Sequence, residues 1–303
     1  MKSIQHGTPF LFADDVKIVY AFRPSLTDIY VQRIQEDLNS LTLWSRYSGL
    51  SFSAQKCQLM AYRCRLAEHA ITLCNSRIPL VSYTKDLGIR YTCHFDFSTQ
   101  ALHQVAKARQ LTFLILRSFH ITASMVALYK QQVRPILEFC PFISTLFQKS
   151  LRIAIEGVQR RFTKAFFPSD NRPTYRARCT LLRLEPLWLR RLKLNLVFLH
   201  QLIYKHSHIA LWRPSFAPNL TYNLRNTQWT VSINRSRTDF HRYSFLNYYS
   251  RIWNKLPISL RSEEEPLAFK RQLRAFLSLD TISRLWSLQL SEDTLFECGP
   301  PRI

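Results

Sequence analysis

Two adjacent aspartates near the start of the chain are the residues best suited to chemistry. Asp14 and Asp15 stand between two short runs, residues 9–13 and 16–22, that are rich in β-branched and aromatic side chains. Such runs around a polar pair predict a β-hairpin with the carboxylates at its tip. Two-metal phosphoryl transfer needs carboxylates that converge on cations about 3.5–4 Å apart, and Mg²⁺ prefers carboxylate oxygens. An adjacent Asp pair is also common in solvated turns, so the pair alone leaves both interpretations open.

The elements that must position this pair follow directly along the chain. Apolar residues recur at helical spacing over residues 25–47, and Gly49 comes just after them. This pattern predicts an amphipathic helix that ends at the glycine. Residues 50–63 and 79–93 are predicted to form strands joined by a polar loop. Residues 1–95 therefore read as a small unit of strands and one helix, built as part of a larger sheet.

From residue 99 to about residue 206 the pattern is helical. Over residues 151–167 the apolar side chains gather on one side of a helix, while Arg160, Arg161 and Lys164 gather on the other. That helix can pack and bind phosphate at the same time. The segment 187–204 is apolar nearly all round, which is typical of a helix at the centre of a bundle.

The last third of the chain has a mixed pattern. Short strand-like pieces with several arginines follow Pro214, and an aromatic cluster follows at residues 243–253. Interleaved aromatic and arginine side chains can stack on bases, but we favour core packing for the rings because large apolar rings are usually buried. Residues 266–279 are predicted to form a further helix.

The charge of the chain is unevenly distributed. Residues 96–262 carry 26 basic and 6 acidic side chains, a net charge of +20, whereas residues 1–95 carry +4 and residues 263–303 carry −2. A central region this basic is expected to meet a polyanion, for which nucleic acid is the usual candidate. A solvated basic surface is the alternative.

Composition narrows the class of protein further. Five glycines in 303 residues, with no Walker-type or GxGxxG segment, argue against a nucleotide-binding loop. No apolar run approaches the roughly 18 residues of a membrane span, so no membrane partner is expected. The seven cysteines are odd in number and form no CxxC pair, so we expect reduced thiols with no disulfide partner in an intracellular protein.

Several segments together resemble a known family. Residues 11–18 (LFADDVKI) look like the F/YADD box of reverse transcriptases from non-LTR retrotransposons (LINE elements) of the jockey type. Similar landmarks follow in the family's order at residues 35–41 (QEDLNSL), 49–57 (GLSFSAQKC), 85–89 (KDLGI), 129–139 (YKQQVRPILEF), 155–164 (IEGVQRRFTK), 187–205 and 243–257, which ends in WNKLP. The resemblance covers nearly the whole chain, and the order of the landmarks is more specific than any single one.

The resemblance implies both a fold and an activity. The fold is of the α+β class, with a truncated polymerase palm over residues 1–95, a basic helical thumb over residues 96–206 and an α/β post-thumb region over residues 207–303. The activity is RNA-directed DNA polymerisation, a two-metal nucleotidyl transfer with Mg²⁺. It uses an RNA template, a DNA primer and deoxynucleoside triphosphates, in the nucleus and the cytoplasm.

The resemblance also implies site residues. Asp14 would be the main metal ligand, Asp15 its weaker neighbour, and Lys56 a candidate to protonate the leaving pyrophosphate. Taken alone, Lys56 is better interpreted as a surface lysine after a turn, and only its place in the order of the motifs favours the catalytic role. Support for the primer end would come from Lys85, Asp86, Leu87 and Gly88. Contacts to nucleic acid would come from Arg152, Arg160, Arg161, Lys164, Arg190, Arg191, Arg235 and Arg237.

The family also needs a third carboxylate and fingers, both upstream of the hairpin. Only residues 1–9 precede the hairpin in this sequence. We therefore expect this chain alone to polymerise poorly or not at all. Two alternatives remain open, a non-catalytic basic nucleic-acid-binding protein derived from such an element and a decayed copy of one.

Overall fold

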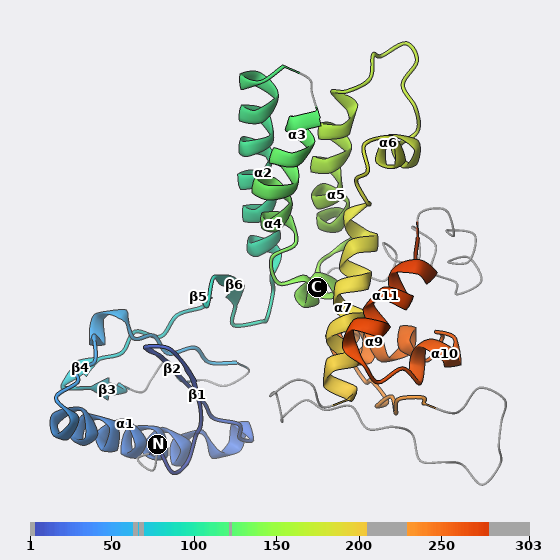
Figure 1. Ribbon diagram of the computed structural model, residues 1–303. Coiled ribbons are helices and arrows are strands. Elements are labelled where there is room, and N and C mark those ends of the chain that lie inside the picture. Colours follow the sequence, from blue (N-terminus) through green and yellow to red (C-terminus); the bar gives the residue numbers. More distant parts are fainter. Residues whose placement is uncertain (1–3, 63–65, 67–69, 121–122, 205–228, 279–303) are drawn as a thin grey trace, which may run out of the picture. The chain divides into compact units, whose positions relative to one another are not determined.

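The computed structural model describes residues 4–62, 66, 70–120, 123–204 and 229–278 (Figure 1). The chain divides into two compact units, Met1–Asp96 and Phe97–Ile303. Helices and small antiparallel sheets occur together, so the predicted α+β class is confirmed. The boundary between the two units follows residue 96, one residue beyond the boundary predicted after residue 95. The second boundary, predicted after residue 206, falls within the second unit.

The first unit combines one long helix with short antiparallel hairpins. Its described elements are β1 (Thr8–Phe12), β2 (Asp15–Val19), the 3-10 turn η1 (Pro24–Leu26), α1 (Thr27–Ser48), the 3-10 turn η2 (Ala54–Lys56), β3 (Thr72–Leu73), β4 (Ser76–Arg77), β5 (Tyr83–Asp86) and β6 (Ile89–Thr92). The strands pair as β1–β2, β3–β4 and β5–β6. The predicted hairpin around the aspartate pair and the predicted helix are both confirmed.

Helix α1 forms because its apolar residues share one face and a glycine ends it. Ile34, Leu38 and Leu41 are buried in a cluster with Ile71, Leu73 and Ile78. Gly49 has a φ of +69°, in the left-handed region that glycine adopts without strain, and it ends the helix one residue after Ser48. The apolar face of α1 therefore packs against the segment that contains the β3–β4 hairpin.

The two strands predicted over residues 50–63 and 79–93 are wrong in their extent. The first segment contains η2 and a single parallel bridge between Leu59 and Leu80, and the second contains the β5–β6 hairpin. Phe52, Cys57 and Leu59 pack against the core cluster of α1. An irregular segment that packs against a helix can therefore show the same spacing of apolar residues as a strand.

The second unit is helical. Its described elements are α2 (Ser98–Ser118), α3 (Ala123–Leu128), the π-helical turn η3 (Tyr129–Val133), α4 (Arg134–Leu137), the 3-10 helix η4 (Pro141–Leu146), α5 (Lys149–Lys164), α6 (Tyr175–Leu181), α7 (Leu187–Ile203), α8 (Asp239–Arg242), α9 (Phe245–Trp253), α10 (Ile258–Arg261) and α11 (Pro266–Phe276). Helices α2 and α5 pack side by side (Figure 1). The helical pattern predicted for residues 99–206 and the last predicted helix are confirmed.

The strand-like pieces predicted after Pro214 are absent from residues 229–242, the described part of that region. Residues 205–228 lie outside the described part of the chain. From Trp229 onward, the described residues hold one isolated bridge at Val231 and then the short helix α8.

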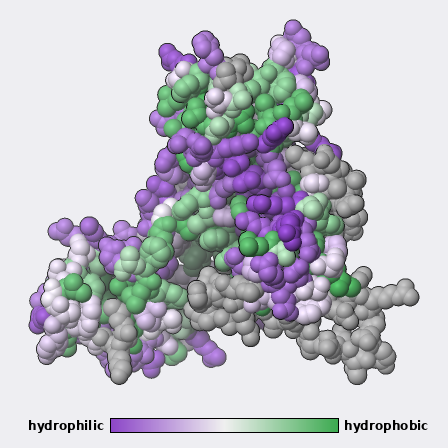
Figure 2. Space-filling view, in the orientation of Figure 1, coloured by the Kyte–Doolittle hydropathy of each residue, from purple (hydrophilic) through white to green (hydrophobic). Residues whose placement is uncertain are grey.

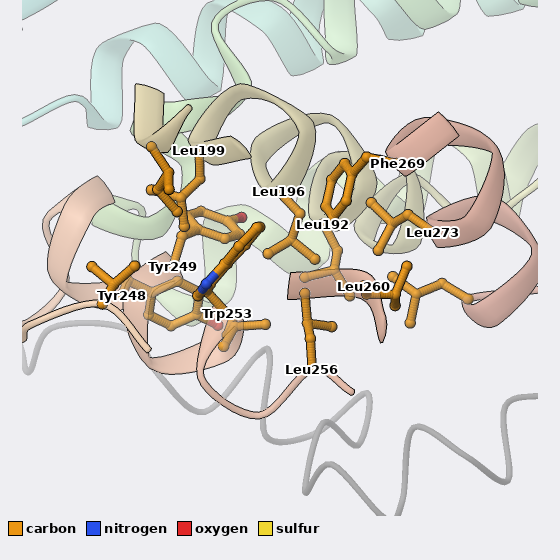
Figure 3. Close-up of a cluster of buried hydrophobic side chains, with 14 of the residues drawn as sticks. Leu192, Leu196, Leu199, Tyr248, Tyr249, Trp253, Leu256, Leu260, Phe269 and Leu273 are labelled. Atoms are coloured by element: carbon orange, nitrogen blue, oxygen red, sulfur yellow. The ribbon is translucent and has the colours of Figure 1, made fainter. Parts of the chain in front are cut away.

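Helix α7 lies at the centre of the larger core, as its apolar sequence predicts. Leu192, Leu196 and Leu199 point toward Trp253 of α9 and Phe269 of α11 (Figure 3). The aromatic cluster of residues 243–253 joins this core, and Tyr249 and Trp253 are 4% and 0% exposed. Core packing is therefore confirmed for the buried rings of this cluster, Phe245, Tyr248, Tyr249 and Trp253, and their burial excludes base stacking by them.

Candidate active site and nucleic-acid interface

The aspartate pair stands at the tip of the β1–β2 hairpin. Phe12 pairs with Asp15, and Ala13 and Asp14 form the two-residue turn between the strands. Ala13 has a φ of +52°, which is uncommon for a residue with a Cβ. Both aspartates are exposed. The hairpin therefore projects two carboxylates into solvent from a hydrogen-bonded base.

A buried carboxylate on α1 holds the start of this hairpin. Asp37, 1% exposed, accepts hydrogen bonds from the backbone N–H groups of Gln5, His6 and Gly7 at 2.8, 3.2 and 3.0 Å. It also accepts one from the Tyr20 hydroxyl at 3.0 Å. Burial and the neighbouring carboxylate raise the pKa of Tyr20, so the hydroxyl stays a donor. Both ends of the hairpin are thereby tied to one side chain.

Gly7 leaves no room for a side chain because two side chains of the hairpin pack closely over it. A Cβ on Gly7 would lie 2.4 Å from Cγ2 of Ile18 and 2.7 Å from the Tyr20 ring. Contacts this short do not occur between carbon atoms in folded proteins, so a residue with a Cβ at this position would force the side chains of Ile18 and Tyr20 to shift.

The aspartate hairpin contacts the turn that carries the predicted primer support. Lys17 of β2 donates a hydrogen bond to Asp86 and another, 3.1 Å long, to the Tyr91 hydroxyl. Burial lowers the pKa of Lys17, but the hydrogen bonds with Asp86 and Tyr91 outweigh it and raise that pKa overall. Leu87 and Gly88, with φ values of +46° and +84°, form the tight turn of the β5–β6 hairpin. The segments 11–18 and 85–89, which are far apart in the sequence, are thus joined by the ion pair between Lys17 and Asp86.

The predicted catalytic lysine, Lys56, forms no contact with the aspartates within the described residues. Lys56 is exposed at the end of η2, and within the described residues its side chain forms no hydrogen bond or ion pair. Lys85 is likewise exposed on β5. The structure therefore brings Asp86 to the aspartate hairpin and leaves the two lysines apart from it.

The described residues do not form a complete site for a metal ion. Asp14 and Asp15 offer oxygen ligands of the type that Mg²⁺ prefers. No group of three or more His, Cys, Asp or Glu side chains in the described ranges is arranged to hold a metal ion. Two adjacent exposed carboxylates do not by themselves fit a two-metal centre, which needs further ligands to fix its geometry.

Helix α5 carries exposed cations on the face opposite its buried apolar residues, as predicted. Ile155, Val158 and Phe162 are buried, whereas Arg161 and Lys164 are exposed. Neither of these two side chains forms a hydrogen bond or ion pair within the described part of the chain. They are therefore available to bind phosphate.

Arg160 is partly withdrawn from the surface. Its guanidinium lies 4.7 Å from the ring centre of Tyr175, in a cation–π arrangement. Tyr175 belongs to α6, so this contact helps to fasten α6 onto α5. Arg160 thus has a structural contact in addition to any role at the surface.

The prediction of phosphate contacts is wrong for Arg152 and Arg191. These side chains are 6% and 5% exposed, and Nη2 of Arg191 lies 3.7 Å from the buried carboxylate of Glu156. A buried guanidinium needs a local counter-charge. The local pattern could not show this, because the burial of a side chain depends on neighbours that are distant in the chain.

Glu156, in the IEGVQRRF landmark, has a structural role that the sequence did not reveal. Its carboxylate accepts hydrogen bonds from the Tyr175 hydroxyl at 2.5 Å and from the backbone N–H groups of Leu187 and Trp188 at 3.0 Å each. These N–H groups begin α7 and have no partner within that helix. Burial raises the pKa of Glu156, although Arg191 and the hydrogen bonds oppose the rise.

Arg190 is an anchored cation. It forms a two-pronged hydrogen bond with Glu138, with Nη2 and Oε2 3.0 Å apart, and Arg134 approaches the same carboxylate at 3.9 Å. Burial, together with Arg134, Arg183 and Arg190, lowers the pKa of Lys130. Positive charge gathers at this junction, but Glu138 neutralises much of the charge of Arg190.

The remaining predicted cations lie near the C-terminal part of the described chain. Arg235 and Arg237 are exposed in an irregular segment before α8. The nearby WNKLP landmark is structural: Asn254 accepts from the backbone N–H of Val231 at 2.8 Å and donates to its carbonyl at 3.0 Å. That pair of bonds holds the irregular segment onto α9.

Comparison with known proteins finds no relative that would identify the function. No protein-family model, no curated protein and no solved structure matches this chain. Among the described helices, none has both the length and the apolar character needed to cross a membrane.

The residues that position the aspartate hairpin are not among those that the sequence pattern predicted. Asp37 could have been suspected, because it lies among the apolar residues Ile34, Leu38 and Leu41 on one helical face, where an unpaired acid is unfavourable. Lys17 had a weaker signal, since strand alternation places it on the same face of β2 as Asp15. The pairing of Lys17 with Asp86 could not be predicted from the local sequence, because the two residues are 69 positions apart.

Proposed function

We propose that the chain is the C-terminal part of a reverse transcriptase of the non-LTR retrotransposon type. The observation that carries this proposal is the contact between Lys17, two positions after Asp15, and Asp86 in the KDLGI landmark. A polymerase must hold its metal ligands beside its primer-supporting segment. A chance likeness to two separate motifs would give no reason for them to meet.

The proposed roles follow from the chemistry of each group. Asp14 and Asp15 would ligate Mg²⁺, which stabilises the charge that develops on the transferred phosphoryl group. Arg161 and Lys164 would hold the primer–template duplex through its phosphates. Because the described residues offer only two metal ligands, we expect polymerisation to require a carboxylate from outside them.

Binding of Mn²⁺, followed by the electron paramagnetic resonance signal of the free ion, tests the role of the aspartate pair. With an RNA–DNA hybrid present, we expect the wild-type chain to bind Mn²⁺ at a site that Asp14→Asn removes. Asp170→Asn is the matched control, because it changes an exposed acid of the second unit. Equal Mn²⁺ binding by wild type and Asp14→Asn would contradict the polymerase assignment.

Primer extension on an RNA template measures the activity itself. We expect little or no extension by this chain alone, because the carboxylate set is incomplete. Efficient extension that Asp14→Ala abolishes would support the polymerase assignment and overturn the expectation that the chain is inactive alone.

A second candidate, a non-catalytic nucleic-acid-binding protein, is favoured by Arg161 and Lys164, two exposed cations near the C-terminal end of α5 that have no partner among the described residues. Each phosphate contact contributes about 0.9 to the slope of log K against log salt. The double variant Arg161→Ala/Lys164→Ala should therefore lower the slope for duplex binding by about 2. Lys149→Ala, at the opposite end of α5, is the control. Duplex binding by Asp14→Asn with no Mn²⁺ site in the wild type would favour this second candidate.

A further inference from the structure

The outer face of α2 carries an aromatic side chain between two arginines. Arg109, Phe113 and Arg117 follow one another at spacings of four residues, so they form a column on one side of the helix. Phe113 is 55% exposed and both arginines are exposed. The opposite face, which includes Ala108 and Ile115, is buried as α2 packs against α5. The column therefore points away from the core.

The stretch of sequence that contains this column has no acidic residue. The chain has no Asp or Glu between Asp96 and Glu138, while five Lys or Arg fall within that stretch. In the part of the chain that the structure describes, Arg109 and Arg117 form no hydrogen bond or ion pair. Unpartnered cations on a solvent-facing helix attract a polyanion.

The apolar part of this surface is also exposed. Leu114 and Phe119, near Phe113, are 49% and 53% exposed, and apolar residues reach the surface at the end of the unit where α2 finishes (Figure 2). The two arginines are eight residues apart, or about 12 Å along the helix. A base stacked on Phe113 would thus lie between two phosphate contacts.

The alternatives fit the column less well. A helix that binds an anionic membrane presents a continuous apolar face, but Arg109 interrupts the exposed apolar residues between Leu102 and Phe113. A duplex hides the faces of its bases inside the stack, so a ring can stack only on unpaired bases.

We propose that the outer face of α2 binds single-stranded nucleic acid, with Phe113 stacked on an unpaired base and Arg109 and Arg117 on the neighbouring phosphates. This goes beyond the proposed function, because it requires neither the aspartate pair nor a duplex. It can hold whether or not the chain belongs to a polymerase.

Fluorescence anisotropy of a labelled twelve-nucleotide oligo(U) with the full chain tests the proposal. Stacking of one base contributes enough that Phe113→Ala should weaken binding about 5- to 100-fold. Phe113→Trp should restore binding, because it keeps the stacking surface. Leu102→Ala is the matched control, since Leu102 is also 55% exposed on α2, and it should leave the affinity unchanged. Phe113→Ala should also leave duplex affinity unchanged.

Three results would overturn the proposal. The first is equal oligo(U) affinity for Phe113→Ala and Leu102→Ala. The second is an effect of Phe113→Ala on binding to phosphatidylserine vesicles but not on oligo(U). The third is a change only in oligomeric state, measured by sedimentation, which would make the face a contact between protein chains. None of these depends on Mn²⁺ binding at Asp14, so this proposal and the polymerase assignment can fail separately.

Discussion

Replacing Asp37 with alanine is expected to release the hairpin that carries the aspartate pair. The buried carboxylate accepts three backbone N–H groups, from Gln5, His6 and Gly7, and the Tyr20 hydroxyl. A hydrogen bond to a charged group contributes about 1.5–3 kcal/mol, and the contributions are not additive. Because the freed N–H groups near the chain start can regain water, we expect a loss of about 3 kcal/mol in the local stability of the hairpin.

Hydrogen exchange measured by mass spectrometry checks this value. A loss of about 3 kcal/mol raises the population of the opened hairpin more than about 100-fold. Peptides from residues 4–20 should therefore exchange faster by that factor in Asp37→Ala. Peptides from α7, in the other unit, should exchange as in the wild type and so provide an internal reference.

The neighbouring residue supplies the control. Glu36 is an exposed acid that pairs with His6 at 3.0 Å, and a surface ion pair of this kind contributes about 0–1 kcal/mol. Glu36→Gln should accelerate exchange less than about fivefold. If Asp37→Ala and Glu36→Gln accelerate exchange in residues 4–20 equally, the buried carboxylate does not hold the hairpin, and the reasoning is refuted.

Two further predictions concern the second unit. Because burial raises the folded-state pKa of Glu156, its contribution to stability is full below its unfolded pKa of about 4.3 and is lost as the pH rises through the folded value. Glu156→Gln should flatten this part of a plot of thermal midpoint against pH, and an unchanged slope would contradict it. Asn254→Ala removes both hydrogen bonds to the Val231 backbone and should lower the unfolding free energy in urea by about 1–3 kcal/mol. Asn254→Asp retains only the hydrogen-bond acceptor, so its unfolding free energy should fall between those of the wild type and Asn254→Ala. A wild-type urea midpoint for Asn254→Ala would show that Asn254 does not hold the Val231 segment.

Local pattern was sufficient for the hairpin and for the long helices. The apolar runs around Asp14 and Asp15, the stripe of α1 with its glycine stop and the apolar α7 all follow from the spacing of residues near one another in the chain. Spacing of this kind decides which face of an element is buried, because the backbone of each element has a fixed period.

The same local pattern failed where an irregular segment contacts a helix. Residues 50–63 place Phe52, Cys57 and Leu59 on the core of α1 without forming a strand. Alternating apolar residues indicate that a segment is half buried, but they do not reveal whether its backbone pairs with a neighbouring strand.

Only the tertiary structure decided which charged side chains are exposed and which are enclosed. Arg161 and Arg191 are both helical arginines predicted to contact nucleic acid, yet the first is exposed and the second is buried beside Glu156. Lys17 and Asp86 meet only because two hairpins fold against each other. The sequence by itself determined the elements and the polarity of their faces, since these depend on neighbours along the chain. The partners of charged groups depend on residues distant in the chain, and these are brought together only when the core forms.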